Sequence, residues 1–525
     1  MGITDGITEL LARPVGNLAD CVRLHAAERP AHLAVIDSRR TLTYAEFDAL
    51  ADRVASALQR DGLRPGAALA ICAAASAEYA AVLVGGLRAG VALVPLAPSS
   101  TAASLAGMVA DADARLLFVD ADVLRELAPV RGSIAVPLVG LAGAPAGQSF
   151  EAWLAPAGSR PREQPVEPQQ VFNIIYSSGT TGTPKGIVHP HELRWNQIRR
   201  VQESSGYGPD AITLISTPLY SNTTLVSFLP TLALGGTAIL MPKFDAQRYL
   251  ELAAQHRVTH SMLVPVQYQR LLARPDFDSY DLSSYRMKFS TSAPLSAALK
   301  ADVLRRWPGG LVEYYGMTEG GGSCVLAAHE FPHKLHTVGR PMEGHDIRLI
   351  DDEGREVAVG EIGEVVGSSS TIMSGYHKQP EKTAAAHWRD ATGKLFIRTG
   401  DVGRFDEDGF LTLMDRKKDM IISGGFNIYP SDLEAVLQRH PDVADCAVVG
   451  VPSQRWGETP VAFVVPRDGA SSLSAEALMG WTNEQVGKTQ RLAALELVAG
   501  LPRSAIGKVL KRELRDAFRP ARAPD

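Results

Sequence analysis

Residues 176–186 read YSSGTTGTPKG and follow an apolar run, VFNII at residues 171–175, that has the length of a buried strand. The glycines let backbone N–H groups turn toward an anion, the hydroxyls can donate hydrogen bonds, and Lys185 adds positive charge. A Walker A loop needs Gly before its lysine and Ser or Thr after it, and both are missing here. A surface loop of small residues is the alternative, but the preceding strand and the lysine favour a polyphosphate-binding loop. Its candidate ligands are Ser177, Ser178, Gly179, Thr180, Thr181, Gly182, Thr183 and Lys185.

On both sides of this loop the sequence alternates between helical patterns and short apolar runs. Thr43 and Glu46 have the spacing of a capping box at the start of a helix. Mainly parallel, buried strands with crossover helices are predicted by the runs at residues 68–72, 92–96, 116–119, 213–216 and 238–241. The segment 142–168, rich in Ala, Gly and Pro, is expected to be an irregular connection.

The chain of 525 residues is longer than one hydrophobic core usually supports, so at least two domains are expected. Residues 346–413 contain short strand patterns with turn signals, which predict a small antiparallel or barrel-like unit. The charged cluster at residues 415–419 then precedes a final α/β stretch. We place the domain boundary between residues 415 and 416.

Composition excludes several classes of protein. The chain is 45% hydrophobic and 21% charged with a net charge of -5, which argues against a dedicated nucleic-acid binder. Asp5 and Glu9 make the N-terminus unlike a secretory signal, and charged residues and glycines interrupt the apolar region 67–95, which is unlike a membrane span. The four cysteines lack metal-binding spacing, so reduced thiols in a cytoplasmic protein are expected.

Three weaker motifs follow the loop, and each has an ordinary alternative. Residues 313–320 (EYYGMTEG) can stack a base, bind a phosphate oxygen and hold Mg²⁺, or they are a strand end with a solvated glutamate. Residues 398–401 (RTGD), followed by Asp415 and Arg416, can clamp a ribose diol or form a turn with a surface ion pair. Residues 501–509 (LPRSAIGKV) place Lys508 where it can bridge carboxylate and phosphate charge, although most terminal lysines are merely solvated.

The fixed order of these motifs resembles the superfamily of acyl-CoA synthetases, adenylation domains of peptide synthetases and beetle luciferases. The match extends from about Leu42 to Leu514, and several degenerate motifs in one order are more specific than any one of them. The resemblance implies an α/β fold. Its large N-terminal domain, residues 1–415, would contain two α/β subdomains and a small β-barrel. A small, mobile α+β C-terminal domain, residues 416–525, would carry the catalytic lysine.

The resemblance also implies roles for individual residues. Thr181 and its loop would grip the β- and γ-phosphates of ATP, Thr318 would contact the α-phosphate, and Glu319 with Thr181 would hold Mg²⁺. Tyr315 would stack on adenine, and Asp401, assisted by Arg416, would take the ribose hydroxyls. The other expected ATP- and AMP-binding residues are Ser292, Ala293, Pro294, Glu313, Tyr314, Gly316 and Met317.

The catalytic set implied by the resemblance is Lys508, Thr318 and Glu319. Lys508 would steer the carboxylate onto the α-phosphorus and offset charge as pyrophosphate leaves. Lys418 would be the hinge at which the small domain swings after this step. The swing would remove Lys508 and bring Ser423, Gly424 and Gly425 to the pantetheine arm of CoA.

The acid pocket departs from the pattern of many relatives. Ser221 stands where many of them have histidine, and residues 291–295 (TSAPL) replace a common GAAPL. Tyr314 stands where hydroxycinnamate-activating relatives usually keep a pocket-opening glycine, whereas Gly316 is small where acetate-specific enzymes have tryptophan. A medium-sized aromatic or short-to-medium aliphatic acid fits best. The expected lining residues are Tyr220, Ser221, Met262, Val264, Tyr314, Gly316 and Met317, and core packing is an equal interpretation for most of them.

The leading hypothesis is an ATP-dependent, AMP-forming acid–CoA ligase that uses ATP, Mg²⁺ and coenzyme A. An acyl-adenylate and pyrophosphate would form first, and acyl transfer to CoA would then release AMP. The alternatives are a stand-alone enzyme that loads a carrier protein's phosphopantetheine, an oxygen-dependent luciferase, and a catalytically inactive nucleotide-binding scaffold. The joint presence of Thr318, Glu319, Asp401, Arg416 and Lys508 argues against the scaffold. The partners expected are small molecules, and a homodimer stays open.

Overall fold

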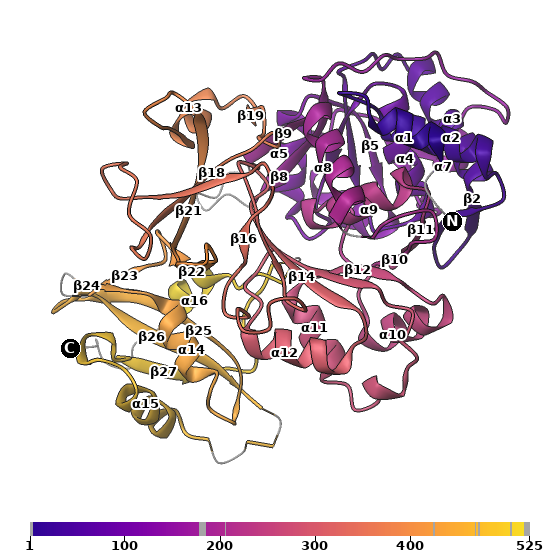
Figure 1. Ribbon diagram of the computed structural model, residues 1–525. Coiled ribbons are helices and arrows are strands. Elements are labelled where there is room, and N and C mark those ends of the chain that lie inside the picture. Colours follow the sequence, from indigo (N-terminus) through magenta and orange to yellow (C-terminus); the bar gives the residue numbers. More distant parts are fainter. Residues whose placement is uncertain are drawn as a thin grey trace. The chain divides into compact units, whose positions relative to one another are not determined.

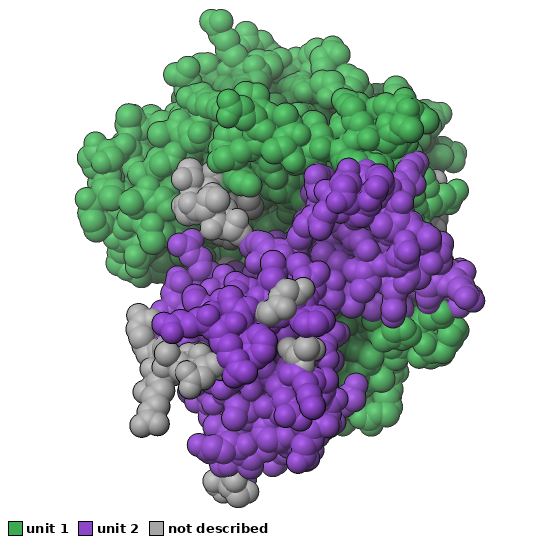
Figure 2. Space-filling view, turned by 90° about the vertical axis from the view of Figure 1, so that its left-hand side faces the viewer, with its two compact units in different colours: residues 1–336, 341–346, 367–397 green, residues 337–340, 347–366, 398–525 purple. Residues whose placement is uncertain are grey.

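The computed structural model describes residues 4–177, 185–204, 206–423, 426–467, 469–470, 473–504 and 507–518 (Figure 1). The chain divides into two compact units (Figure 2). Unit 1 contains residues 1–336, 341–346 and 367–397, and unit 2 contains residues 337–340, 347–366 and 398–525. Within the described part of the chain, every helix is too short or too polar to cross a lipid bilayer.

The first sheet of unit 1 has eight strands in the order β19-β9-β8-β4-β3-β5-β6-β7. Neighbours from β8 to β7 are parallel, and β9 and β19 add an antiparallel edge. The strands are β3 (Ala68–Cys72), β4 (Ala92–Pro95), β5 (Ala114–Val119), β6 (Leu138–Gly140), β7 (Gln148–Ser149), β8 (Val171–Ser177), β9 (Lys185–Pro190) and β19 (Gly375–Tyr376). The predicted buried parallel strands are confirmed here.

The second sheet has nine strands in the order β16-β15-β14-β13-β12-β10-β11-β1-β2, and its strands from β14 to β1 are parallel. After β10 the chain continues to β11 on one side and then returns to β12 on the other. Such a switch point opens a crevice at the carboxyl ends of the two strands. The strands are β1 (Leu33–Ile36), β2 (Thr41–Thr43), β10 (Ile212–Ile215), β11 (Thr237–Leu240), β12 (His260–Leu263), β13 (Met287–Ser290), β14 (Gly310–Tyr315), β15 (Cys324–Ala327) and β16 (Arg340–Pro341).

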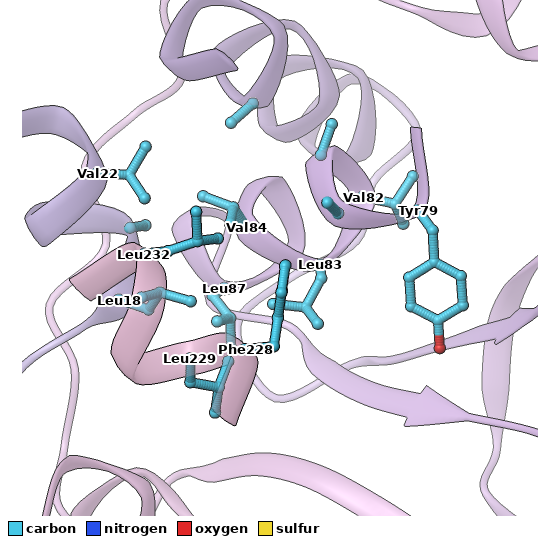
Figure 3. Close-up of a cluster of buried hydrophobic side chains, with 14 of the residues drawn as sticks. Leu18, Val22, Tyr79, Val82, Leu83, Val84, Leu87, Phe228, Leu229 and Leu232 are labelled. Atoms are coloured by element: carbon cyan, nitrogen blue, oxygen red, sulfur yellow. The ribbon is translucent and has the colours of Figure 1, made fainter. Parts of the chain in front are cut away.

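Four helices build the main hydrophobic cluster of unit 1. They are α2 (Leu18–Glu28), α3 (Tyr44–Arg60), α4 (Ala77–Arg88) and α9 (Asn222–Ala233). Figure 3 shows Leu18 of α2, Leu87 of α4 and Phe228 of α9 gathered in this cluster, which also includes residues of both sheets. The predicted capping box at the start of α3 is confirmed, since the Thr43 hydroxyl and the Glu46 carboxylate each accept the other's backbone N–H.

The segment 142–168 is irregular apart from β7 and α7. The remaining helices of unit 1 are α1 (Asp5–Leu11), α5 (Ala102–Asp111), α6 (Ala121–Glu126), α7 (Phe150–Trp153), α8 (His191–Ser204), α10 (Ala246–Gln255), α11 (Pro265–Leu272), α12 (Ala297–Arg306) and α13 (Pro380–Ala385). Two 3-10 helices are η1 (Ala128–Ser133) and η2 (Phe277–Ser279).

The turn-rich stretch expected to be antiparallel or barrel-like forms a five-stranded sheet, in which β18 and β21 run across the division between the units. Its strands are β17 (Asp346–Ile350), β18 (Gly363–Ser368), β20 (His387–Arg389), β21 (Leu395–Phe405) and β22 (Leu411–Arg416). The antiparallel pairing of β21 with β22 lies in unit 2 and aligns Asp401 with Arg416. The segment therefore places the two halves of the expected ribose clamp side by side.

The C-terminal part of unit 2 is a five-stranded sheet with apolar clusters on both faces. Alternate residues of its long hairpin enter different clusters, Cys446 and Val448 on the α14 and α15 side and Val449 and Val451 on the α16 side. The elements are β23 (Ile421–Ser423), β24 (Phe426–Ile428), β25 (Val443–Ser453), β26 (Gly457–Pro466), β27 (Ala494–Leu497), α14 (Pro430–Leu437), α15 (Ala475–Glu484), η3 (Lys488–Gln490) and α16 (Lys511–Ala517).

We expect Leu232→Ala to destabilise unit 1 much more than Leu33→Ala, which removes the same atoms from an exposed position. Leu232 is 0% exposed in the helical cluster, whereas Leu33 is 38% exposed on β1. Truncating a fully buried leucine costs about 2–5 kcal/mol, and an exposed site costs a small fraction of this. Urea denaturation measures the free energy of unfolding of both variants. Equal losses in the two variants would contradict the packing described for α9.

Candidate active site

Four neighbouring strands of the nine-stranded sheet lead into the predicted site segments at one edge. Because parallel strands end on the same side of a sheet, the residues that follow them gather there. Tyr220 and Ser221 lie beyond β10, Val264 follows β12, residues 291–294 follow β13, and residues 316–319 follow β14. The sheet thus brings together the acid-pocket residues and the motif of residues 313–319.

The predicted phosphate loop connects β8 and β9, two neighbouring strands of the other sheet of unit 1. Ser177 of β8 pairs with Lys185 of β9, so the loop is a hairpin connection between antiparallel strands. The Lys185 ammonium lies 5.1 Å from the centroid of the Tyr376 ring. The predicted ligands Ser178, Gly179, Thr180, Thr181, Gly182 and Thr183 lie outside the described residues, as does the side chain of Ser177.

Tyr376 connects the lysine of this loop to the expected metal ligand. Its hydroxyl donates a hydrogen bond of 2.8 Å to Oε1 of Glu319. Burial and the Glu319 carboxylate raise the pKa of Tyr376, so the phenol stays protonated and keeps donating. Sequence reasoning missed Tyr376, because its importance depends on a contact across 57 positions of the chain.

Hydrogen bonds from other segments to its backbone carbonyl groups hold the turn after β14 in place. Nε2 of His189 lies 2.7 Å from the carbonyl oxygen of Thr318, and the N–H of Met373 donates to the carbonyl of Glu319 at 3.0 Å. Gly320 has a φ of +79°, and a Cβ there would lie 1.8 Å from the carbonyl oxygen of Thr371. Glycine is therefore required at this position. The positions of Thr318 and Glu319 thus depend on distant segments of unit 1.

Glu313 forms a buried ion pair. Its Oε2 lies 2.5 Å from Nζ of Lys300, and both side chains are almost fully buried. Oε1 accepts a hydrogen bond of 3.2 Å from the backbone N–H of Leu295. Burial raises the pKa of Glu313, with the Lys300 charge acting in the opposite direction. The carboxylate therefore ties β14 to helix α12 and to the end of the predicted adenine-side segment, residues 292–294.

Ser292 in that segment has an unusual backbone conformation. Its φ is +77°, in the left-handed region that residues other than glycine rarely adopt. The Ser292 hydroxyl forms a hydrogen bond with that of Thr223, which lies in the first turn of α9. Residues held in such conformations cluster at functional sites. The departure from the common GAAPL pattern is thus accompanied by a contact that ties this segment to α9.

A stack of aromatic rings supports Tyr314. Tyr207 stacks on His260 and on Phe289, with centroid distances of 4.4 and 5.8 Å, and Phe289 stacks on Tyr314 at 5.9 Å. Tyr314 itself is half-buried. Of the other expected lining residues, Met262 and Val264 are 3% exposed, and Met262 belongs to the main cluster. The ring stack therefore restricts the position of the Tyr314 side chain, whereas Met262 is packed in the hydrophobic core.

Unit 2 contains both residues of the expected ribose clamp, Asp401 and Arg416. Nε of Arg416 lies 3.2 Å from Oδ1 of Asp401, its partner across β21 and β22. The backbone N–H of Asp401 donates to the Thr399 hydroxyl at 3.0 Å, and that hydroxyl donates to the carbonyl of Val365 at 2.9 Å. Arg398 is engaged elsewhere, in an ion pair with Glu364. The motif RTGD thus contributes its aspartate, and not its arginine, to the clamp.

Lys508 interacts with this clamp within unit 2. Burial, together with the positive charges of Arg416 and Lys418, lowers the pKa of Lys508 to about 8, while Asp401 acts in the opposite direction. The Lys508 backbone is held by reciprocal hydrogen bonds with Ser504. Residues far apart in the sequence therefore form one electrostatic cluster. Lys418, the expected hinge, belongs to it.

The expected pantetheine segment is described only in part. Ser423 ends β23 and pairs with Gly457 of β26. Gly424 and Gly425 lie outside the described residues. Gly457 has a φ of +81° and closes the turn of the long hairpin β25–β26. The predicted role of this segment with CoA stays a prediction.

Comparison with known proteins identifies the family. The model of the AMP-binding enzyme family matches residues 22–377, and that of the AMP-binding enzyme C-terminal domain matches residues 432–508. The chain belongs to the AMP-binding enzyme family. Indoleacetate–CoA ligase of Aromatoleum aromaticum is 34% identical over 511 residues, 95% of this chain and 97% of that protein. A fatty acid–[acyl-carrier-protein] ligase, ScoC of Streptomyces coeruleorubidus, is 33% identical over 95% of this chain and 96% of its own length.

The solved structures agree with this assignment. ATP-bound MatB from Rhodopseudomonas palustris aligns with a TM-score of 0.86 at 29% identity, over 96% of this chain and 99% of that protein. The predicted family and the α/β fold class, with a large N-terminal and a smaller C-terminal domain, are confirmed. This AMP-binding enzyme is an AMP-forming acid–thiol ligase of the acyl-CoA synthetase type, a class that uses ATP, Mg²⁺ and CoA.

The described residues suit the magnesium that accompanies ATP in AMP-binding enzymes. Mg²⁺ is usually held by one or two carboxylates together with substrate phosphates, and not by a cage of protein ligands. Among the described residues no cluster of three His, Cys, Asp or Glu side chains could hold a metal. Glu319 presents one carboxylate, oriented through Oε1 by Tyr376. Glu319 could therefore hold an ion that arrives with the nucleotide.

The buried pair in this AMP-binding enzyme gives a test by double substitution. We expect Lys300→Met to lower the free energy of unfolding by about 3–5 kcal/mol, because it leaves the Glu313 carboxylate buried without a cation. Lys300→Met combined with Glu313→Gln should recover more than half of this loss, since the neutral amide can still accept from Leu295. Chemical denaturation at neutral pH measures the free energy of unfolding of the unmodified protein, the single variant and the double variant. A double variant no more stable than Lys300→Met would show that the pair is not coupled.

Proposed function

We propose that this chain activates a medium-sized carboxylic acid as its adenylate and transfers the acyl group to CoA. The observation that carries the proposal is the cluster of Lys508, Lys418, Asp401 and Arg416 in unit 2. A lysine of lowered pKa beside a carboxylate–arginine clamp suits a reaction in which negative charge develops on phosphate oxygens. The Lys185, Tyr376 and Glu319 contacts in unit 1 supply the matching phosphate and metal chemistry.

In the first half-reaction the acid carboxylate attacks the α-phosphorus of ATP and pyrophosphate leaves. Lys508 offsets the charge of the carboxylate and the phosphate oxygens, and Thr318 contacts the α-phosphate. Glu319 would hold Mg²⁺, which would supply positive charge to the phosphate oxygens, and Asp401 with Arg416 takes the ribose hydroxyls. Residues of the phosphate loop, including Thr181, grip the β- and γ-phosphates. The protein thus contributes positioning and electrostatic stabilisation, with no covalent enzyme intermediate.

In the second half-reaction the CoA thiolate attacks the acyl carbon, and AMP leaves. We propose that the boundary between residues 415 and 416 separates the mobile domain, with Lys418 as its hinge. Movement there removes Lys508, which is no longer needed, and brings Ser423, Gly424 and Gly425 to the pantetheine. The two half-reactions therefore use different faces of one small domain.

The acid is proposed to be aromatic, or aliphatic of short to medium chain length. Tyr314 limits the depth of the pocket because the ring stack behind it prevents its retreat. Gly316 is small where acetate-specific relatives have tryptophan, and even a Cβ there would lie 2.8 Å from the Ser323 hydroxyl. The indoleacetate of the A. aromaticum relative is an acid of this size and class.

We further propose a cytoplasmic location, which is supported by four buried and unpaired cysteines. We also propose that the protein forms a homodimer. Light scattering tests this by measuring the molar mass in solution.

Lys508→Ala should reduce acyl-adenylate formation by about 100-fold or more, because one charged group is removed from the transition state. The same variant should form thioester from supplied acyl-adenylate at close to the normal rate. Pyrophosphate exchange and thioester assays measure the two steps separately. Equal loss in both steps would contradict the two-position mechanism.

The kcat/KM of the first half-reaction should also decrease as the pH rises through about 8, the pKa of Lys508 in the protein without nucleotide, since the neutral amine no longer offsets negative charge. The Lys508→Arg variant stays cationic over this range, so its kcat/KM should show no such decrease, which we call the alkaline limb, even if its activity is lower at every pH. Values of kcat/KM for ATP in pyrophosphate exchange between pH 6 and 10 test this. An unchanged alkaline limb in Lys508→Arg would assign the limb to another group.

A panel of acids with CoA as acceptor tests the proposed reaction and its specificity. We expect CoA thioesters with aromatic acids such as indoleacetate, and little product with acetate. Tyr314→Gly should shift the preference toward longer hydroxycinnamate-like acids by about 10-fold, because it removes the floor of the pocket.

Two results of this panel would redirect the proposal. Products formed only on holo carrier proteins would favour the carrier-loading alternative, which the likeness to ScoC keeps open. Absence of acid-dependent pyrophosphate exchange across the panel would favour the inactive scaffold.

A further inference from the structure

A buried polar network lies next to the strand that follows the phosphate loop. On one side of the His189 ring, Nε2 lies 2.7 Å from the carbonyl oxygen of Thr318. On the other side, Nδ1 lies 2.9 Å from Nη2 of Arg194 and 3.0 Å from Nδ2 of Asn173. The His189, Arg194 and Asn173 residues are each at most 1% exposed. Their hydrogen-bonding roles are therefore set by one another and not by water.

The network determines which nitrogen of His189 carries the proton. A guanidinium can only donate hydrogen bonds. Nε of Arg194 donates to Oδ1 of Asn173 at 2.9 Å, which fixes the orientation of that amide and turns its NH₂ toward the ring. Nδ1 of His189 therefore faces two donors and must be the unprotonated acceptor. The proton lies on Nε2, which donates to Thr318.

Arg194 also prevents the ring from acquiring a second proton. Its Nη1 donates to Gln197 at 2.9 Å and to Asn222 at 2.8 Å, and in the described part of the chain it has no carboxylate partner. Burial lowers the pKa of Arg194 to about 9, which leaves it cationic at neutral pH. Burial and this neighbouring charge hold the pKa of His189 well below its usual range. The neutral ring is therefore the stable form.

Thr318 needs such a partner because of its position in the fold. The strand β14 ends at Tyr315, so the carbonyl of Thr318 lies beyond the sheet ladder. Backbone groups that regular structure does not satisfy must find another partner, or they cost free energy and leave the turn poorly fixed. His189 provides this partner from a strand of the other sheet of unit 1.

We propose that His189 is a positioning residue for adenylation, which holds the backbone of Thr318 in place, and that Arg194 and Asn173 lock the tautomer required for this. The inference rests on the proposed contact of Thr318 with the α-phosphate. Arg194 extends the network to Asn222, the residue next to Ser221 in the predicted acid pocket. One buried cation thus connects the turn that carries Thr318 with the segment that borders the acid.

Three substitutions separate the hydrogen bond from the bulk of the ring. The amide of His189→Gln reaches the place of Nε2 and can donate to Thr318, whereas His189→Asn reaches only the place of Nδ1, and His189→Leu can donate at neither. His191→Leu is the matched control. His191 is also 1% exposed, and its ring nitrogens have no hydrogen-bond partner among the described residues.

We expect kcat/KM for ATP in pyrophosphate exchange to fall by about 10-fold or more in His189→Leu and His189→Asn. His189→Gln should stay within about 3-fold of the unmodified enzyme. His191→Leu removes two buried ring nitrogens that make no hydrogen bond among the described residues, so it should leave the urea midpoint unchanged or higher and kcat/KM within about the same 3-fold. Equal impairment of the Gln and Asn variants, or a similar kinetic loss in His191→Leu, would overturn the inference.

The tautomer can be measured without any reaction. Nitrogen-15 NMR of histidine-labelled protein should show His189 neutral and protonated at Nε2 from pH 6 to 8, with the assignment made by His189→Gln. A ring protonated at Nδ1 would overturn the inference even if the enzyme activates none of the acids tested. Failure of the unmodified enzyme to exchange pyrophosphate would instead refute the proposed function, so the two failures are distinguishable.

Discussion

The parallel direction of the strands in the nine-stranded sheet is the constraint on which the candidate site of unit 1 depends. Since β10, β12, β13 and β14 all end at one edge, segments separated by about a hundred residues become neighbours there. In open α/β sheets, ligands bind at such a switch of strand order, which lies here between β10 and β12. In the other sheet, the predicted phosphate loop lies where β8 ends and the chain turns back as the antiparallel strand β9. The direction of the strands thus determines which edge of each sheet carries the candidate site residues.

Backbone direction does not hold the segments still, and unit 1 uses buried charges for this purpose. The Lys300–Glu313 pair ties β14 to α12, and Arg194 orients His189 against Thr318. Burying a charge is unfavourable, and a hydrophobic replacement is often at least as stable. Hydrogen bonds from such charges are directional, however, whereas hydrophobic contacts are not. Fixing the turns at the edge of the sheet is a physical reason for keeping charges in the core.

The sequence was sufficient to predict what depends on local pattern. The capping box at Thr43, the buried strands and the family motifs follow from neighbours within a few positions. Tyr376 and His189 could not be predicted, because each acts through a contact 57 or 129 positions away. Buried tyrosines and histidines are usually core residues, so composition gave no signal. The second histidine of the sequence H-P-H, His191, illustrates this, since it is equally buried and its ring nitrogens make no hydrogen bond within the described chain.

The cluster in unit 2 suggests how the lysine is prepared for its step. Without a nucleotide, burial and the charges of Arg416 and Lys418 disfavour the cationic form of Lys508, and Asp401 only partly compensates. A bound polyphosphate would add negative charge, which raises the pKa of a neighbouring lysine. The ligand would thus supply negative charge that stabilises the cationic form of Lys508. In the proposed mechanism, most of that negative charge is lost once pyrophosphate departs, and the attraction that would keep Lys508 at the reacting atoms weakens with it. Release of the lysine for the second half-reaction would then follow from the same electrostatics that make it useful in the first.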